Sequence, residues 1–387
     1  MKWLLFIFFI LTESSCLLVK GQNQQITISL FNDYAVQTYV VTPVSGNYSL
    51  IADSQVIEQL PQGAILYLSL MEDSIVVRQI DHTIGQYARV ELKGNGDHDF
   101  FRIKPVFPAL PARNYDDNVI FSFSLNRIQA NNTVSFIKYL AGVVETEAGP
   151  NAELEFYKAQ ASLCRTYAFA NLNKHASEGF NLCDGVHCQA YKKRCDKELI
   201  LQAVQKTHNL VIVTDSMKLI TAAFHANCGG QTQNSEDEWL VSLPYLRSVK
   251  DPYCSKKRDS HWEITIPRAK WIAYLQQYGY KFPENTDFSC WQNVRRPLYK
   301  SGEFSLPFKK IRFDFNLRSS YFSVIDKGSS VLFKGRGYGH GVGLCQDGAM
   351  QMAKEGKYFE QIIHFYFTGV AIVEKDMQED EPTGQQP

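Results

Sequence analysis

Neither sign of charge is in excess in this sequence, which has 40 Lys and Arg residues against 40 Asp and Glu residues. Without a net positive field the chain is a poor ligand for polyanions, so we expect no nucleic acid partner. The sequence also lacks the H-E-x-x-H pattern of zinc peptidases and the G-x-S-x-G pattern of serine hydrolases. The H-x-E and P-C-x-x-C signature of zinc deaminases is absent too, which excludes a third class of enzyme.

Long apolar runs are scarce as well. The run at the start of the sequence extends from Trp3 to Leu11, follows a single Lys, and is too short to cross a bilayer. Small polar residues and the sequence VKG follow it, which is typical of a secretory signal peptide over residues 1–21. The alternative is a lipoprotein signal with Cys16 as the lipidated residue, although Glu13 stands where an apolar residue is expected. We expect no transmembrane anchor once the leader is removed.

The rest of the chain changes in pattern along its length. Short alternating apolar runs separated by Gly, Asn and Asp predict a β-rich module over residues 22–117, which ends in a proline-rich connector. Residues 118–373 mix helical and strand patterns and include a long amphipathic helix, predicted over residues 151–175. Residues 374–387 are polar and acidic and are predicted to be disordered. The predicted fold class is therefore α+β.

Two glutamates stand two residues apart in the stretch GVVETEAGP, which begins at Gly142. At about 100° per residue of a helix, Glu147 projects close to Leu140 and Val143, whereas Glu145 projects to the opposite side. A carboxyl group on a packed face has a raised pKa and can act as a general acid near neutral pH. The alternative is that Glu147 reaches solvent at the helix end or pairs with a Lys.

Cysteine is well represented, with nine residues, one of them in the predicted leader. In an exported protein, cysteines are expected to be paired or bound to metal. One cluster combines Cys183, His187 and Cys188 with His175 upstream, and these are ligand types that zinc takes. A disulfide between Cys183 and Cys188 that closes a small loop is the alternative.

Two further stretches combine glycine with polar side chains. The sequence FHANCGGQTQNSEDEW places amide and carboxyl groups beside Trp239, which suits a sugar ring or, alternatively, a surface loop anchored by the indole. The sequence GRGYGHGVGLCQDGA has glycine at every second residue from Gly335 to Gly343 and matches neither a dinucleotide site nor a phosphate loop. It predicts a backbone packed tightly against another segment, with His340 and Gln346 presented from it.

Six stretches together resemble the stage II sporulation protein D family, which includes amidase enhancers. They are YLAGVVETEAG, YKAQASLCRTYA, LCDGVHCQAY, NCGGQTQNSEDEW, PYLRSVKDPY and GRGYGHGVGLCQDGA, in that order, within residues 118–373. The resemblance implies an exported bacterial lytic transglycosylase in the periplasm or cell envelope. Such an enzyme cleaves the bond from N-acetylmuramic acid to N-acetylglucosamine in peptidoglycan strands without stem peptides and leaves 1,6-anhydro ends. A cell-wall amidase is a further implied partner.

The resemblance also implies roles for individual residues. The family's catalytic acid maps to Glu147, which acts as the single acid and base and requires no cofactor. The zinc that some members bind maps to Cys183, His187 and Cys188, with His175 as a fourth ligand, and has a structural role. Residues expected to bind or align the substrate are Lys158, Arg165, Tyr167, Cys228, Gly229, Gly230, Gln231, Glu238 and His340.

The sequence departs from the family in three respects, one of which is Asn209 at the end of the third predicted helix, where the family usually has Gly. Ala148, Gly149 and Pro150 follow Glu147 where Met-Pro is frequent, and the pairing of Cys254 and Cys290 stays open. Two other functions also stay open. One is a non-catalytic glycan-binding module that enhances a wall amidase and leaves the glutamate silent. The other is a zinc-dependent hydrolase, although a zinc ion with four protein ligands has no open position for water.

Overall fold

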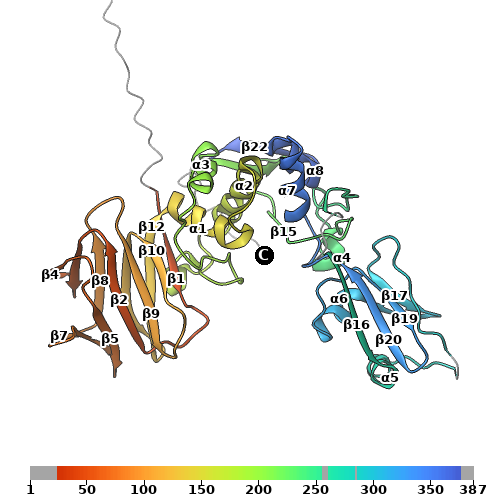
Figure 1. Ribbon diagram of the computed structural model, residues 1–387, viewed down its shortest axis with the longest axis horizontal. Coiled ribbons are helices and arrows are strands. Elements are labelled where there is room, and N and C mark those ends of the chain that lie inside the picture. Colours follow the sequence, from red (N-terminus) through yellow and green to blue (C-terminus); the bar gives the residue numbers. More distant parts are fainter. Residues whose placement is uncertain (1–23, 255–259, 284–285, 376–387) are drawn as a thin grey trace, which may run out of the picture.

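The computed structural model describes residues 24–254, 260–283 and 286–375. The predicted leader, residues 1–21, and residues 376–387 of the predicted tail lie outside these ranges. Figure 1 shows three parts: a β-rich part at one end, a helical part in the middle, and a smaller part with strands and helices at the other end. Helices and strands are both abundant along the described chain, which confirms the predicted α+β class.

The N-terminal part consists of two sheets packed face to face. Their strand orders are β13-β1-β12-β11-β8-β3-β4 and β10-β9-β2-β5-β6-β7. Alternate side chains point into the core, as in β2, where Tyr39 and Val41 are buried and their neighbours are partly exposed. Tyr39 meets Phe121 of the other sheet, with ring centroids 5.7 Å apart. The strands are β1 (Gln25–Leu30), β2 (Thr38–Ser45), β3 (Tyr48–Ala52), β4 (Gln55–Leu60), β5 (Leu66–Met71), β6 (Ser74–Arg78), β7 (Thr83–Tyr87), β8 (Arg89–Gly94), β9 (Phe100–Phe107), β10 (Arg113–Asp116), β11 (Asn118–Ser124), β12 (Arg127–Ser135) and β13 (Leu182–Cys183).

The boundary of this part lies at residue 135, where β12 ends. Strand β11 pairs with β8 and β12, and β12 pairs with β1 in the register Gln25↔Ser135. Residues 118–135 therefore complete the first sheet, and the predicted division after residue 117 falls between strands of one sheet. The proline-rich stretch that suggested this division contains the end of β9, the short connection to β10, and β10 itself.

Helix α2 is the centre of the helical part and packs against α1, α3, α7, α8 and β14. Twelve of its 17 residues are buried, so the predicted amphipathic helix is a core helix with neighbours on almost every side. Strand β22 pairs with β14 and extends to Glu374, the first residue of the predicted tail. The elements are α1 (Phe136–Ala148), α2 (Leu154–Ala170), η1 (Ala176–Glu178), α3 (Glu198–Lys206), β14 (Leu210–Thr214), α7 (Gln346–Lys354), α8 (Phe359–Tyr366) and β22 (Val370–Glu374).

Residues 261–336 form the third part, which has an aromatic core of its own. Trp271 lies at its centre, with the rings of Tyr299 and Phe333 at 5.4 and 5.2 Å. The sequence predicted one domain over residues 118–373, whereas the structure inserts this part into it, between α4 and β21. The elements of the third part are β16 (His261–Pro267), α5 (Arg268–Gln277), β17 (Leu298–Ser301), β18 (Phe304–Pro307), α6 (Phe308–Asp314), β19 (Phe322–Asp326) and β20 (Ser330–Arg336). The elements that flank it in the chain are β15 (Phe224–His225), α4 (Ser235–Trp239) and β21 (Leu344–Cys345).

Within the ranges that the structure describes, no helix combines the length and the apolar character that a membrane crossing needs.

Candidate functional site

The last turn of α1 holds Glu147 against the segment that follows the Cys/His cluster. The backbone N–H of Ala190 donates a hydrogen bond of 2.8 Å to Glu147 Oε1. The side chain is partly buried, and this desolvation raises the pKa of Glu147, although the Ala190 N–H and the charge of Lys192 lower it in part. The carboxyl group therefore keeps its proton at a higher pH than a free glutamate does, which agrees with its predicted place on the packed face.

The side of α1 to which Glu145 is predicted to project, opposite Leu140 and Val143, is not open to solvent. Its side chain is buried, with the residue only 4% exposed, and it pairs with Lys193 and accepts a hydrogen bond of 3.1 Å from the Asp196 N–H. The segment that contains these partners covers the outer face of α1. Gly142 makes this possible, because a Cβ atom there would lie 2.5 Å from the Lys193 carbonyl oxygen. Glu145 is thus an internal anchor for this segment.

The glycine-rich stretch reaches the same helix end from the other side. Gln346, the first residue of α7, donates hydrogen bonds of 3.2 Å to the Glu147 carbonyl and 3.4 Å to Gln160 Oε1. The prediction of a tightly packed backbone is confirmed at Gly343, which has a φ of 71° and whose Cβ would lie 2.2 Å from the Ala223 carbonyl oxygen. The glycine-rich stretch therefore places an amide side chain beside Glu147.

His340, from the same stretch, is held as a neutral scaffold residue. Its Nε2 lies 2.9 Å from the Phe224 carbonyl oxygen, and its Nδ1 accepts a hydrogen bond of 3.1 Å from the Val342 N–H. Burial lowers the pKa of His340 to about 4. The ring also packs against Trp239, with centroids 5.4 Å apart. Both ring nitrogens are engaged by the backbone, so the structure gives the substrate no free nitrogen on this side chain.

The Cys-Gly-Gly loop, predicted to align the substrate, faces the interior. Cys228 is fully buried, and its thiol points at Asp251. A Cβ atom on Gly229 would lie 2.9 Å from the Arg336 backbone, and the Gly230 N–H points at a buried sulfur. The next residue, Gln231, donates to Ser248 and accepts from the Arg295 N–H. The loop is therefore a packing element.

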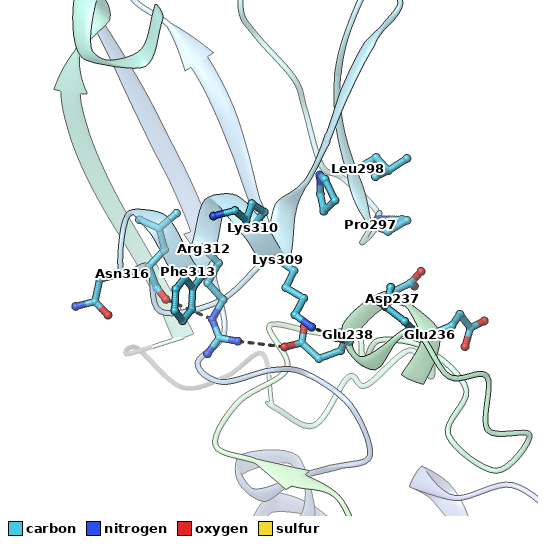
Figure 2. A pocket seen from close by; sticks show the side chains of 13 residues that line it. Glu236, Asp237, Glu238, Pro297, Leu298, Lys309, Lys310, Arg312, Phe313 and Asn316 are labelled. Atoms are coloured by element: carbon cyan, nitrogen blue, oxygen red, sulfur yellow. Dashed lines mark hydrogen bonds and ion pairs between the residues drawn. The ribbon is translucent and has the colours of Figure 1, made fainter. Parts of the chain in front are cut away.

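Glu238 lines a cavity of about 920 Å³ between α4 and α6. Figure 2 shows its carboxylate facing Arg312, while Lys309 reaches the Glu238 backbone carbonyl. Burial raises the pKa of Glu238, and the nearby cations oppose this shift. Phe313 and Leu317 supply apolar walls. The lining residues do not include Glu147, so this predicted substrate residue belongs to a different surface.

The three residues predicted on α2 have different surroundings. Lys158 forms an ion pair of 2.6 Å with Glu155 on the same helix. Arg165 is 2% exposed and donates to the Val204 and Leu210 carbonyls, both at 3.1 Å. Burial lowers the pKa of Arg165 to about 9. The prediction that Arg165 binds substrate is therefore wrong, because its guanidinium group fastens α2 to the end of α3 and the start of β14.

Tyr167, the third of these residues, contacts the Cys/His cluster. Its hydroxyl group lies 3.5 Å from the His187 carbonyl oxygen and 3.4 Å from Lys174 Nζ. Burial raises its pKa, so the side chain is an uncharged phenol. The structure therefore assigns Tyr167 to the wall of the cluster.

The four predicted metal ligands converge. One ligand atom each from His175, Cys183, His187 and Cys188 lies within 4.8 Å of the other three. Cys188 Sγ is 3.5 Å from His175 Nε2 and 3.9 Å from His187 Nδ1. Tetrahedral zinc with ordinary bond lengths requires ligand separations of about 3.3–3.8 Å. Glu178 lies 2.6 Å from His175 Nδ1, which leaves Nε2 free to face a metal.

Reasoning from the sequence missed the residues that hold Glu147. Ala190 acts through its backbone and gives no signal as a residue type. Lys192 is recognisable only as one of several basic residues after the Cys/His stretch. The Cys/His stretch could have indicated this neighbourhood, because Ala190 follows Cys188 by only two positions.

The amino-acid sequence is similar to one protein family and to several known proteins. The family model described as "Stage II sporulation protein" matches residues 124–213. Stage II sporulation protein D of Bacillus amyloliquefaciens is 31% identical over 261 residues, covering 62% of this chain and 74% of that protein. Stage II sporulation protein D of Bacillus subtilis is 29% identical over 272 residues, covering 64% and 78%. The "Amidase enhancer" of Bacillus subtilis is 25% identical over 288 residues, covering 60% and 40%.

Proposed function

The chain belongs to the stage II sporulation protein D family, and from this membership and the surroundings of Glu147 we propose that it is a lytic transglycosylase of bacterial peptidoglycan. Its substrate is a glycan strand without stem peptides, located in the periplasm or cell envelope. The bond cleaved is that from N-acetylmuramic acid to N-acetylglucosamine. The observation that carries the proposal is the partly buried Glu147 carboxyl group, which has a raised pKa at a helix end.

A single carboxyl group is sufficient for this reaction. Glu147 in its protonated form donates its proton to the leaving glycosidic oxygen as the bond to the anomeric carbon breaks. The resulting carboxylate then accepts the proton of the muramic acid C6 hydroxyl group, whose oxygen bonds to the anomeric carbon. The product is a 1,6-anhydro sugar, no water is consumed, and Glu147 regains its proton. Acid and base catalysis of this kind contributes about 10² to 10⁴ in rate.

The surroundings of Glu147 suit both halves of this cycle. Desolvation favours the protonated acid before cleavage, and the Ala190 N–H stabilises the carboxylate that follows. Glu145 is the neighbouring carboxylate on α1, and its oxygens are occupied by Lys193 and the Asp196 N–H. Hydrolytic glycosidases commonly use two carboxyl groups, so the engagement of Glu145 favours the mechanism with one.

We propose a structural zinc ion at His175, Cys183, His187 and Cys188. Four protein ligands of these types close a tetrahedral site, so the metal would cross-link the chain without joining the reaction. Cys188 precedes Ala190 by two residues, and Tyr139 of α1 donates a hydrogen bond of 3.4 Å to the intervening Gln189. A fixed Cys188 therefore restrains the N–H group that holds Glu147.

One observation favours the alternative of a glycan-binding enhancer of a wall amidase. The cavity beside Glu238 offers carboxylates, cations and apolar walls away from Glu147. Among the described residues, Glu238 Oε2 is buried without a hydrogen-bond partner, as expected of a group that meets a ligand. The relative named "Amidase enhancer" is consistent with this alternative, in which Glu147 takes no part.

The experiment that separates the two functions is mass spectrometry of purified, peptide-free glycan strands incubated with the full chain. The proposed activity produces fragments with 1,6-anhydro ends. Fragments with hydrolytic reducing ends would contradict a transglycosylase, and binding without cleavage would favour the enhancer.

A further inference from the structure

A second cluster of metal-binding side chains lies outside the proposed site, at the base of the inserted part. Cys228, Asp251, Cys254 and Cys345 each offer one ligand atom, and these four atoms lie within 4.8 Å of one another. The sulfur of Cys228 is 3.2 Å both from Cys254 Sγ and from Asp251 Oδ2. All four residues are buried, and Asp251 is only 1% exposed. Three separate segments of the chain meet at this point.

The charge of Asp251 has no basic partner among the ion pairs of the described residues. Its oxygens receive hydrogen bonds from the Tyr366 hydroxyl at 2.9 Å, the Tyr253 N–H at 2.9 Å and the Cys254 N–H at 3.3 Å. Buried charges in proteins are paired or coordinate a metal. A divalent cation would supply the positive charge that this carboxylate lacks.

Backbone N–H groups point at the sulfur atoms, as they do around thiolate ligands. The Gly230 N–H donates to Cys254 Sγ at 3.1 Å, and the Cys228 N–H donates to Cys345 Sγ at 3.2 Å. Cys345 is also the N-cap of α7 and accepts from the Gly348 N–H at 3.4 Å, where the helix dipole favours negative charge. Such second interactions orient metal ligands and stabilise the thiolate form.

The start of α7 packs closely against the Asp251 carboxylate. A Cβ atom on Gly348 would lie 2.2 Å from the Tyr366 hydroxyl oxygen and 2.3 Å from Asp251 Oδ2. Only glycine at this position lets the start of α7 approach the carboxylate while its N–H reaches Cys345. The packing thus brings the acid and the three thiols to one point.

From these contacts we propose a second, structural zinc site with Cys228, Asp251, Cys254 and Cys345 as its ligands. Zinc binds three thiolates and one carboxylate oxygen in a tetrahedron with separations of about 3.6–3.8 Å. The Cys228 sulfur lies 3.2 Å from Cys254 Sγ and from Asp251 Oδ2, so these pairs would move apart by about half an ångström around the metal. The thiols release their protons to solvent as the metal binds. A disulfide between Cys228 and Cys254 is the competing state. It would use only two sulfurs and leave the buried carboxylate without a cation.

The site would fix the inserted part on the helical part. Cys254 lies shortly before the insertion, which starts at His261, and Cys345 lies shortly after its end at Arg336. One metal ion would therefore hold both connections and the 228–230 loop together. The burial of all four ligands excludes substrate, so the role is structural. This role does not depend on the proposed cleavage activity.

The test is the zinc content of the full chain purified without chelator, measured by native mass spectrometry and elemental analysis. Cys254→Ser should lose one equivalent of zinc relative to the parent. Cys290→Ser is the matched control, because Cys290 belongs to neither cluster, and it should keep the parental content. Equal zinc in the parent and Cys254→Ser would overturn the site. So would a peptide cross-linked through Cys228 and Cys254 in the parent.

A variant of the first cluster keeps the test decisive if Cys254→Ser does not fold. His187 is exposed, so His187→Ala should fold. X-ray absorption can then count the sulfur atoms around the zinc that remains bound to this variant. Three sulfurs are expected at the second site. A sulfur count of two, or no zinc, would contradict the proposal. Loss of one equivalent of zinc is expected in His187→Ala, and a parental zinc content in this variant would count against the first site only.

Discussion

Ala190 and Glu147, 43 residues apart in the sequence, meet through a hydrogen bond of 2.8 Å from the backbone N–H to the carboxylate. This bond joins the end of α1 to the segment that leaves the Cys/His cluster. It stabilises the charged carboxylate, whereas desolvation stabilises the acid, and desolvation has the larger effect. The balance between them sets the pH at which the proposed catalyst can give up a proton.

Replacing Lys192 should shift the pH dependence of cleavage. Lys192 lowers the pKa of Glu147 through its charge, so Lys192→Gln should raise that pKa further. The proposed acid must be protonated, and the alkaline limb of the rate profile should therefore move to higher pH. Lys193→Gln is the control, because Lys193 pairs with Glu145. A limb that stays in place in Lys192→Gln, or moves to lower pH, would count against Glu147 as the acid.

Glu147 should also leave a signature in stability. Its pKa in the folded chain is raised above the ordinary 4.5, so its favourable contribution is complete below pH 4.5 and is lost as the pH rises through the folded pKa. Glu147→Gln does not titrate. The unfolding free energy of Glu147→Gln minus that of the parent should therefore increase between acidic and neutral pH, by about 1.4 kcal/mol for every pH unit that separates the folded and unfolded pKa values. Denaturant titrations across this range measure it, and a constant difference would refute the raised pKa.

Arg165→Met should destabilise the fold without a specific effect on glycan binding. The change removes a charged donor from each of the Val204 and Leu210 carbonyls, at a cost of about 3 kcal/mol. Lys158→Met on the same helix removes an ion pair with partly exposed side chains and should cost less than about 1 kcal/mol. Chemical denaturation compares the two variants. Equal losses of unfolding free energy in the two variants would show that Arg165 does not stabilise the packing of α2 against α3 and β14.

Loss of metal from the Cys/His cluster should impair cleavage indirectly. Cys188→Ser is expected to lose one equivalent of zinc and to loosen the Ala190 N–H. Misplacement of a catalytic group by about 1 Å costs about 10² in rate. Cleavage should therefore fall by about this factor while strands still bind, and Cys290→Ser should behave like the parent. Full activity in a zinc-free Cys188→Ser protein would separate the cluster from Glu147.

Local periodicity predicted the face of Glu147 but not the surroundings of Glu145. Helical spacing within α1 determines which side of the helix each residue takes, and that information lies in adjacent residues. The burial of Glu145 depends on a segment about 50 residues further along the chain. The one local sign of that segment was Gly142, where the helix lacks a side chain.

The same limit explains the errors at larger scale. Arg165 was expected to align the substrate because it lies in one of the stretches that carry the family resemblance, but its partners are carbonyls about 40 residues away. The third part of the fold was not predicted because its separate core depends on contacts between residues far apart in the segment, such as Trp271 with Phe333. The Cys/His cluster was predicted because its residue types alone specify the chemistry.

The most direct test of the central claim compares Glu147→Gln with Glu145→Gln on peptide-free glycan strands, with anhydro ends counted by mass spectrometry. Glu147→Gln should bind strands and produce no anhydro ends, because glutamine cannot donate and recover a proton. Glu145→Gln should lose stability, by about 1–3 kcal/mol, because its buried ion pair is broken, yet cleave like the parent per folded molecule. Anhydro ends at the parental rate from Glu147→Gln would contradict the account.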